Sequence, residues 1–397
     1  MNRKLIVFFI FVPSMFFLTG CWDSMELNDR AIELAWGIDK AKNKDIQIST
    51  QIIIPSKIGG GQGGGSGGSQ GKPFFVATGI GKDTLDAVQQ MQTKLSRQIF
   101  RGQRRVIVIG ESLARQGIKD VLDTYTRDPN INLLTDIFVI KGGTAKDFLK
   151  TSYPLENIPA LGALKEYNQM GALNEVGFLN FLLSATSEGS YPTMPAIAFG
   201  SPSSSSIGDQ SNTKGFSIAG TGIFNKDLKL IGFLDVEAGK VLRWVTGNLD
   251  KLTITAFVPQ KKGYVSLDIN KLDSMIKPMM QRNKIKIFIT LNGQGMIREN
   301  NTSLDLTQIK NITIAQKALD KHVEKMVLKT VTKIQKEYGT DVFGISDVIQ
   351  RKNPHQWKSL EKNWDRKFSE AEVSVKVNLT VRRIGVTGPS IFDRKSD

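Results

Sequence analysis

Few residues of this chain are of the types that carry covalent or metal-binding chemistry. Its 397 residues include one cysteine, Cys21, and two histidines, His322 and His355. One cysteine cannot form an internal disulfide bond, and these three residues are too few for a zinc site built from cysteine and histidine. We therefore expect no metal and no cofactor, and Cys21 is the residue whose chemistry must be explained first.

The residues before Cys21 indicate an export signal. Arg3 and Lys4 precede an apolar run, residues 5–18, and small residues follow it. This order is typical of a signal peptide, and at about 1.5 Å per residue the run is too short to cross the ~30 Å hydrocarbon core of a membrane. We therefore expect residues 1–20 to be an export signal and not a membrane-spanning anchor.

Cys21 itself is predicted to carry the anchor. Leu18, Thr19, Gly20 and Cys21 resemble the lipobox of bacterial lipoproteins, in which the thiol receives a diacylglycerol and the peptide bond before it is cut. Two acyl chains hold a protein stably at a membrane, whereas a single chain binds only marginally. We expect cleavage between Gly20 and Cys21 and a membrane lipid anchor, diacylglyceryl-Cys21. The alternative is an ordinary secretory signal with a chance cysteine.

Residues 58–72 contain a glycine-rich segment that imitates phosphate-binding motifs. Gly59, Gly61 and Gly64 satisfy the G-x-G-x-x-G pattern, but nine glycines between residues 59 and 71 match such patterns trivially. The P-loop pattern fails, because Pro73 follows Lys72 where Ser or Thr is required. The composition is typical of a flexible loop, which we place at the tip of a hairpin.

Basic side chains recur every four residues along a predicted helix. They are Lys317, Lys321, Lys325, Lys329 and Lys333. Asp320 and Glu324 can each pair with the lysine three residues before, but Lys325 and Lys329 have no acidic partner at helical spacing. The two are either a solvated face or a contact with a membrane or a protein partner.

The positive charge of the chain is concentrated in its second half. The formal net charge is +15, and residues 215–397 carry 31 basic and 19 acidic side chains, against 20 and 19 in residues 21–214. A basic protein often binds nucleic acid, but an exported chain does not meet any. We therefore expect a membrane surface or an acidic partner and no nucleic acid.

Helical and strand-like periods alternate in the first half, residues 21–200. This alternation predicts an α/β region with a mixed, partly parallel sheet and helices, folded as one unit or as two subdomains. Strands are expected at 33–39, 45–54, 74–80, 105–109 and 135–140, and helices at 84–98, 113–125, 144–149 and 174–185. A less regular stretch is expected after Pro159.

A Ser-rich segment, residues 201–214, is predicted to link the two halves. Beyond it we expect a hairpin, a short helix and further strands, at 216–224, 229–233, 236–244, 252–258, 263–269, 284–291 and 373–381. Residues 312–338 repeat apolar side chains at steps of three and four, which predicts one long helix packed on a sheet. Residues 215–387 are therefore assigned to an α+β C-terminal domain, and residues 388–397 to a polar tail.

Several short segments carry a resemblance that runs from the lipobox to about Gly385. They are Cys21-Trp22-Asp23 with Glu26-Leu27, Gly37-Ile38-Asp39, Gly220-Thr221-Gly222-Ile223-Phe224 with Gly232-Phe233-Leu234, Asp341-Val342-Phe343-Gly344, and Trp357 with Trp364 and Phe368. In their order and spacing these segments resemble the Ger(x)C family, the C subunits of the nutrient germinant receptors of endospore-forming bacteria.

The resemblance implies a lipoprotein on the outer face of the spore inner membrane that is needed for germination in response to nutrients. Its implied partners are a polytopic A subunit and a transporter-like B subunit. It also implies a multidomain α/β fold and a binding or assembly role without catalysis. Of the family's functional residues, only the lipidated cysteine carries over, onto Cys21.

Two other classes of protein remain open. A solute-binding lipoprotein of a transporter would also be exported and lipidated, but it needs two similar lobes around a cleft, and the two halves here differ in their patterns. A lipid-anchored hydrolase needs a base beside a nucleophile. His322 falls inside the predicted long helix and His355 beside Pro354, which makes a Ser-His-Asp triad improbable, although pairs of carboxylates stay open.

Overall fold

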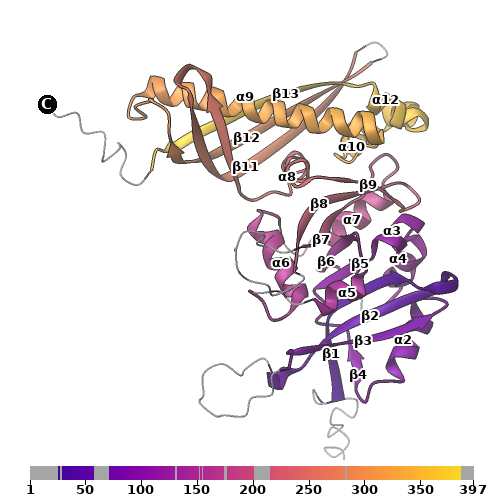
Figure 1. The fold of residues 1–397 in the computed structure, drawn as a ribbon. Coiled ribbons are helices and arrows are strands. Elements are labelled where there is room, and N and C mark those ends of the chain that lie inside the picture. The colour runs from indigo at the N-terminus through magenta and orange to yellow at the C-terminus, as the bar shows by residue number, and fades with distance from the viewer. Residues whose placement is uncertain are drawn as a thin grey trace, which may run out of the picture.

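The structure is a computed structural model, and it describes residue 26 and residues 29–57, 71–129, 132–151, 153, 155–173, 177–200, 215–281 and 284–385. Two sheets lie one above the other in Figure 1, and helix α8 (Val236–Val245) lies between them. The export signal, most of the glycine-rich segment, the Ser-rich linker and the polar tail fall outside the described residues.

The larger sheet has nine strands in the order β3-β2-β1-β5-β6-β7-β8-β9, with β4 beside β1. Its central strands β1, β5, β6 and β7 run parallel, and the pairs toward both edges are antiparallel. The strands are β1 (Arg30–Lys40), β2 (Ile46–Ile53), β3 (Phe74–Gly81), β4 (Gln98–Phe100), β5 (Val106–Ile109), β6 (Asp136–Lys141), β7 (Thr193–Phe199), β8 (Phe216–Phe224) and β9 (Leu230–Leu234). The predicted mixed, partly parallel sheet is confirmed.

Helices cover both faces of this sheet, which explains the apolar runs of its central strands. All four side chains of β5 are buried, Val106 and Val108 in one core and Ile107 and Ile109 in the other. The helices are α2 (Thr84–Gln92), α3 (Glu111–Gln116), α4 (Lys119–Thr126) and α7 (Gly177–Thr186) on one face, and α5 (Ala145–Lys150) and α6 (Pro159–Gln169) on the other.

Three of the helix predictions for this half were wrong. The expected helix 84–98 ends at Gln92, and residues Gln98–Phe100 form strand β4. The expected single helix 113–125 is interrupted at Gly117, whose φ of +122° lies in a region that favours glycine and ends α3. Helix α6 was not expected, because Pro159 was taken as the end of regular structure. Proline occupies the first turn of α6, where its missing N–H costs nothing.

The hairpin of β8 and β9 belongs to the larger sheet, although we expected it to open the C-terminal domain. Strand β8 pairs with β7 in antiparallel register, from Ile223 opposite Thr193 to Phe216 opposite Phe199. The strands on either side of the segment 201–214 are therefore neighbours in one sheet. The chain passes from the larger sheet to the smaller one after β9, at α8.

The smaller sheet has the strand order β10-β11-β12-β13. Its strands are β10 (Leu252–Val258), β11 (Gly263–Gln281), β12 (Lys284–Asn300) and β13 (Glu372–Arg383), and only the pair β12 and β13 is parallel within the described sheet. Strand β12 runs nine residues beyond the predicted end at residue 291. The prediction stopped too early because Gly293 and Gly295 resemble strand breakers in the sequence, but both lie inside the strand. A Cβ on Gly295 would lie 2.1 Å from the Asp268 carbonyl oxygen, so the close strand contact requires glycine.

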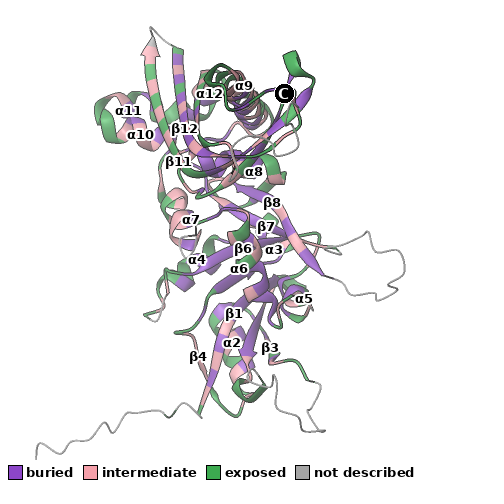
Figure 2. Ribbon diagram, turned by 90° about the vertical axis from the view of Figure 1, so that its left-hand side faces the viewer, coloured by how far each residue is buried: buried purple, intermediate pink, exposed green. Residues whose placement is uncertain are grey.

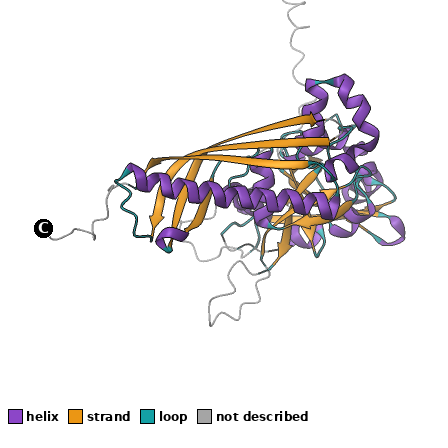
Figure 3. Ribbon diagram, turned by 90° about the horizontal axis from the view of Figure 1, so that it is seen from above, coloured by secondary structure: helices purple, strands orange, loops and turns teal. Residues whose placement is uncertain are grey.

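Helix α9 (Ile309–Lys333) lies along one face of the smaller sheet (Figure 3). Its buried side chains include Ala315, Leu319, Val323, Val327 and Val331, which recur every four residues. The predicted long helix packed on a sheet is confirmed, and one π-helical turn (Ile334–Tyr338) extends it. Three short helices then lead to β13: α10 (Ile345–Lys352), α11 (Pro354–Leu360) and α12 (Trp364–Ser369).

Burial is continuous between the two sheets. Figure 2 shows buried residues through the strands of both sheets and through the region of α8. The core of the smaller sheet includes Ile223 and Leu234 of the larger sheet and Tyr191 of the segment before β7, together with side chains of α8 and α9. Among the described residues, no helix is long and apolar enough to cross a membrane.

Candidate functional site

The predicted anchor and cleavage residues, Cys21 and Gly20, lie outside the described residues. Lipidation and cleavage therefore stay predictions. The other predicted contact residues, Lys325 and Lys329, are described and lie one turn apart on the exposed side of α9.

Lys325 and Lys329 line a hollow of about 320 Å³ between α9 and α8, which we call the α8–α9 hollow. Its wall also carries Asp235, Glu237, His322 and Lys333. Lys333 Nζ lies 3.9 Å from Asp235 Oδ2, whereas neither Lys325 nor Lys329 forms an ion pair with any described residue. Two carboxylates stand near the lysines, so the surface is less positive than the sequence alone indicates.

The acidic residues of α9 have a different role from the one expected. Asp320 Oδ1 accepts a hydrogen bond from the backbone N–H of Leu379 at 2.8 Å, and Glu324 Oε1 accepts one from that of Val377 at 3.3 Å. Within the described chain neither carboxylate pairs with the lysine three residues before it, so that prediction was wrong. Asp320 and Glu324 therefore face β13 and not the row of lysines on α9.

These bonds close the outer edge of the smaller sheet. Strand β13 is its last strand, and every second N–H of an edge strand lacks a strand partner. Gln316 Oε1 accepts the N–H of Val381 at 3.0 Å, so three side chains of α9 at steps of four serve three successive free N–H groups of β13. Burial raises the pKa of Asp320 to about 6, against the opposing effect of the bond from Leu379.

The Gly37-Ile38-Asp39 segment supports the larger sheet. Asp39 is the buried next-to-last residue of β1, and its two carboxylate oxygens accept the N–H groups of Ala145 at 2.7 Å and Lys146 at 2.9 Å. These are the first two residues of α5, so Asp39 caps that helix from a distant strand. A Cβ on Gly110 would lie 2.0 Å from Asp39 Oδ1, which leaves room there for glycine alone.

Asp341 organises the turn before α10. It is fully buried, and its carboxylate accepts the backbone N–H groups of Phe343, Ile345 and Ser346 at 3.1, 3.2 and 2.8 Å. The indole N–H of Trp364 also donates to Oδ2, at 3.2 Å. Burial raises the pKa of Asp341 to about 6 although these bonds oppose the shift. The carboxylate thus ties α10 to α12.

Residues 187–191, between α7 and β7, connect the larger sheet to this turn. The hydroxyls of Ser187 and Ser190 donate to the two oxygens of Asp347, each at 2.6 Å. Between them, a Cβ on Gly189 would lie 2.3 Å from Ser346 Cβ. The backbone of Gly189 therefore lies directly against the side chain of Ser346.

Further polar contacts complete this connection. Lys226, in the turn between β8 and β9, donates to the carbonyl oxygens of Ser187 at 2.6 Å and Ser190 at 2.5 Å. Burial lowers the pKa of Lys226, and nearby carboxylates, Asp365 first among them, oppose the shift. The Tyr191 hydroxyl donates to Asp365 at 2.6 Å. We call residues 187–191, Lys226, 341–347, Trp364 and Asp365 the polar junction.

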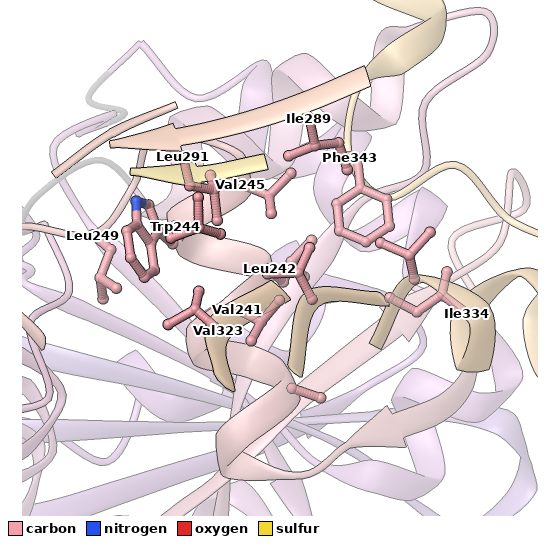
Figure 4. Close-up of a cluster of buried hydrophobic side chains, with 14 of the residues drawn as sticks. Val241, Leu242, Trp244, Val245, Leu249, Ile289, Leu291, Val323, Ile334 and Phe343 are labelled. Carbon is pink, nitrogen blue, oxygen red and sulfur yellow. The ribbon is translucent and has the colours of Figure 1, made fainter. Parts of the chain in front are cut away.

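The apolar part of the same region is built around α8 (Figure 4). Leu242 and Val245 of α8 lie among Ile289 of the smaller sheet, Val323 of α9 and Phe343 of the polar junction. On its other side α8 touches β8 so closely that a Cβ on Gly239 would lie 2.7 Å from Thr221 Oγ1. The two sheets are thus joined by a continuous core as well as by hydrogen bonds.

The chemistry available at the polar junction is hydrogen bonding. Its carboxylates, Glu188, Asp341, Asp347 and Asp365, all accept bonds from within the chain. His322 lies in the α8–α9 hollow and His355 is exposed at the start of α11, and in the described chain neither forms a side-chain hydrogen bond or ion pair. The arrangement holds two parts of the protein together through these hydrogen bonds.

From the sequence we named some residues of the polar junction but did not predict their role in it. Asp341 and Trp364 belong to the segments that carry the family resemblance, but their residue types do not predict that they contact each other. Ser187, Ser190 and Lys226 were missed altogether, because isolated serines and lysines in turns carry no periodic signal. The one available signal was the clustering of polar residues in the segment 184–190, between a helix and a strand.

Comparison with known proteins gives the family. Residues 23–199 match the model of the spore germination protein N-terminal domain, and residues 219–385 match the spore germination B3/GerAC-like C-terminal model. The chain is 30% identical to the putative spore germination protein YfkR of Bacillus subtilis (strain 168), over 93% of this chain and 94% of that one. It is 27% identical to spore germination protein KC of the same organism, over the full length of both chains.

The fold is similar to that in the crystal structure of the GerBC protein. The TM-score is 0.56 at 19% sequence identity, with 87% of this chain and 96% of that chain covered. At this sequence identity the match supports the fold alone. Two family models that cover both halves in order, and relatives matched over nearly their whole length, give one conclusion: the chain belongs to the Ger(x)C family of spore germination proteins.

Proposed function

We propose that this chain is the lipid-anchored C subunit of a nutrient germinant receptor, needed for spore germination in response to nutrients. The observation that carries the proposal is the match of both halves, residues 23–199 and 219–385, to the two spore germination models. The expected partners are the A and B membrane subunits of the receptor. The expected location is the outer face of the spore inner membrane.

In this proposal the protein acts by binding and assembly and not as a catalyst. The polar junction and the core around α8 give the two sheets a fixed relative position, which suits a rigid body that contacts other subunits. Such a body needs a firm attachment to the membrane, and diacylglyceryl-Cys21 supplies two acyl chains at the start of the mature chain.

A solute-binding lipoprotein of a transporter is the less favoured alternative. That class has two similar lobes around a cleft. Here the described chain forms a nine-stranded mixed sheet covered on both faces and a four-stranded sheet with one long helix, and the two have different topologies. The core between them is continuous and contains Tyr191 and Leu234 from one side and α8 in the middle.

The α8–α9 hollow is the proposed contact surface within the second half. Lys325 and Lys329 are exposed there, and among the described residues no carboxylate pairs with them. Their charge is therefore available to anionic headgroups or to an acidic surface of a receptor subunit, at about 1 kcal/mol per lysine that reaches a membrane surface.

The anchoring step is tested by Cys21→Ala in a spore-forming host that lacks the native gene. The variant removes the one thiol that can carry the acyl chains, so it is expected to leave the membrane fraction in a high-salt wash and to slow nutrient-triggered germination. The matched control is Met25→Ala, which changes the same segment and keeps the lipobox. Retention of the Cys21→Ala protein in washed membranes would show that the anchor lies elsewhere.

A further inference from the structure

A cavity of about 290 Å³ lies where the two sheets meet, beside the polar junction, and we call it the Arg243 cavity. Its wall comes from α7, β7 and β8 on one side and from α8 and the turn 342–344 on the other. Both parts of the chain therefore contribute to it, and small-molecule sites occur preferentially at such boundaries.

Arg243 is the one charged side chain on the described wall of this cavity. The residue is 7% exposed, and its Nε and Nη2 atoms are buried without a hydrogen-bond partner in the described chain. A buried guanidinium whose N–H groups lack acceptors is unfavourable, because the group has lost its water and gained nothing in exchange. Unpaired buried charges are rare in proteins and call for a partner.

Among the described residues, the main neighbour of the Arg243 guanidinium is an aromatic ring and not an anion. Its guanidinium carbon lies 5.1 Å from the centre of the Tyr167 ring, a cation–π contact that holds the side chain but accepts neither N–H. Burial raises the pKa of Tyr167, and the positive charge of the neighbouring Arg243 guanidinium opposes this shift. No described carboxylate forms an ion pair with Arg243.

The two unpaired nitrogens define the shape of the missing acceptor. Nε–H and Nη2–H lie on the same edge of a guanidinium and point in parallel, which matches the two oxygens of a carboxylate. The rest of the wall, as far as the structure describes it, is uncharged and combines hydroxyls of Ser184, Thr193 and Thr221 with apolar groups such as Leu183. A molecule with one carboxylate and a small neutral body fits this distribution, whereas a polyanion finds no second cation there.

We propose that the Arg243 cavity binds a small organic molecule with a single carboxylate, held by Nε–H and Nη2–H of Arg243. Both nitrogens are closed to water in the structure, so the Arg243 side chain or the wall shifts as the carboxylate enters. Because the wall is shared by both sheets, the bound molecule stabilises their contact. The inference does not depend on the proposed function, since binding is a property of the purified chain.

The test measures the melting temperature of the full-length chain, purified in detergent, against increasing concentrations of defined probes at constant ionic strength. The probes are propionate, benzoate and N-acetylglycine, each compared with its amide, together with inorganic phosphate. At least one carboxylate is expected to raise the melting temperature progressively with concentration, while its amide does not. Equal shifts for acid and amide, a shift with phosphate alone, or no shift at all would overturn the proposal.

Variants of Arg243 test whether this residue binds the carboxylate. Arg243→Met keeps the apolar stem and is expected to abolish the carboxylate shift without lowering the melting temperature of the free protein. Arg243→Lys keeps the charge but not the paired donors, and should weaken binding by about tenfold. Arg351→Met, on the exposed side of α10, is the matched control and should bind like the wild type. Unchanged binding in both Arg243 variants contradicts the assignment, and the probe comparison on the wild type stands even if Arg243→Met fails to fold.

One internal carboxylate needs its own control. Glu175 stands in the sequence between Leu173 and Gly177, which line the cavity, and it lies outside the described residues. The proposal requires that the wild-type chain binds the probe carboxylate with Glu175 present. If only the Glu175→Gln variant binds, the chain supplies the carboxylate itself and the proposal is wrong.

Discussion

Asp320 on α9 accepts a hydrogen bond from the backbone N–H of Leu379 on β13 at 2.8 Å, so a helix side chain takes the place of a neighbouring strand. With Gln316 and Glu324, it satisfies the outer edge of the smaller sheet. Exposed sheet edges invite pairing with other chains, and this arrangement covers the edge with the helix that also covers the face. The arrangement places a carboxylate where burial disfavours its charge.

The pH dependence of stability should reveal Asp320. Its pKa rises from 3.8 to about 6 on folding, so the folded chain binds more protons between these values. The stability that this group contributes is therefore complete below about pH 4 and is lost as the pH rises through 6. Asp320→Asn keeps an oxygen for Leu379 and removes the titration, so the free energy of unfolding should fall less between pH 4 and pH 6.5 than in the wild type. Identical pH profiles for the two proteins would contradict this account. Asp123→Asn, at an exposed carboxylate, is the control.

Asp341 should be far less tolerant of the same substitution. Oδ1 accepts from Phe343 and Ile345, and Oδ2 accepts from Ser346 and Trp364, so all four donors need oxygen acceptors. Asparagine offers one oxygen and turns an NH₂ group toward two donors. Asp341→Asn is expected to lower the free energy of unfolding by about 2–4 kcal/mol, since each buried unsatisfied group costs about 1–3 kcal/mol.

Urea denaturation followed by tryptophan fluorescence measures this loss. The control Asp227→Asn changes an exposed aspartate in the turn between β8 and β9 and should leave the midpoint in place. A loss at Asp341 no larger than at Asp227 would mean that the carboxylate is not the organising group of the polar junction.

Shortening the glycine-rich segment should not harm the fold. Strands β2 and β3 pair down to Ile53 opposite Phe74, and the N–H of Ile54 donates to the Pro73 carbonyl oxygen at 2.7 Å, so the hairpin is closed before the segment begins. Deleting residues 61–68 shortens a loop whose closure costs only about 0.6 kcal/mol per doubling of length. The melting temperature should stay equal or rise slightly, and nutrient response should persist. A large fall in either would show that the segment contains a site.

The α8–α9 hollow is tested by Lys325→Glu with Lys329→Glu. Binding of the purified chain to anionic vesicles, or to the isolated membrane subunits, is expected to weaken at low salt and to change little at high salt, because salt screens exposed charges. The melting temperature should move little. Lys42→Glu with Lys44→Glu makes the same change of charge in the exposed turn between β1 and β2. If both double variants lose binding equally, or if the Lys325 and Lys329 variant still binds vesicles and membrane subunits normally, the two lysines are only a solvated face.

Local periodicity predicted those parts of the fold in which one face is buried. The repeat of Leu319, Val323 and Val327 gave the long helix, and alternating isoleucines gave the start of β12, because each pattern records one buried face. Alternating helices and strands also predicted the parallel centre of the larger sheet. The ends of the helices and strands were predicted less accurately. Gly293 and Gly295 look like strand breakers but lie inside β12, and Pro159 looks like a helix breaker but lies at the start of α6.

Relations between distant segments were not predictable in this way. The hairpin of β8 and β9 was expected, but its pairing with β7 is a contact that no local pattern encodes. Asp320 and Glu324 were assigned to lysines on their own helix because the sequence does not show that β13 lies beside them. Arg243 reads as an ordinary polar position of a short amphipathic helix, and only the fold places it in a buried cavity.

The central claim is membership in a germinant receptor complex, and co-purification tests it most directly. The chain, with an affinity tag after residue 397, is isolated from detergent-solubilised spore membranes, and the associated proteins are identified by mass spectrometry, with Cys21→Ala as the comparison. We expect a polytopic membrane protein and a transporter-like membrane protein to co-purify in constant ratio with the wild type. Recovery of the chain with the ATPase and permease of a solute transporter, or with no membrane protein at all, would contradict the account.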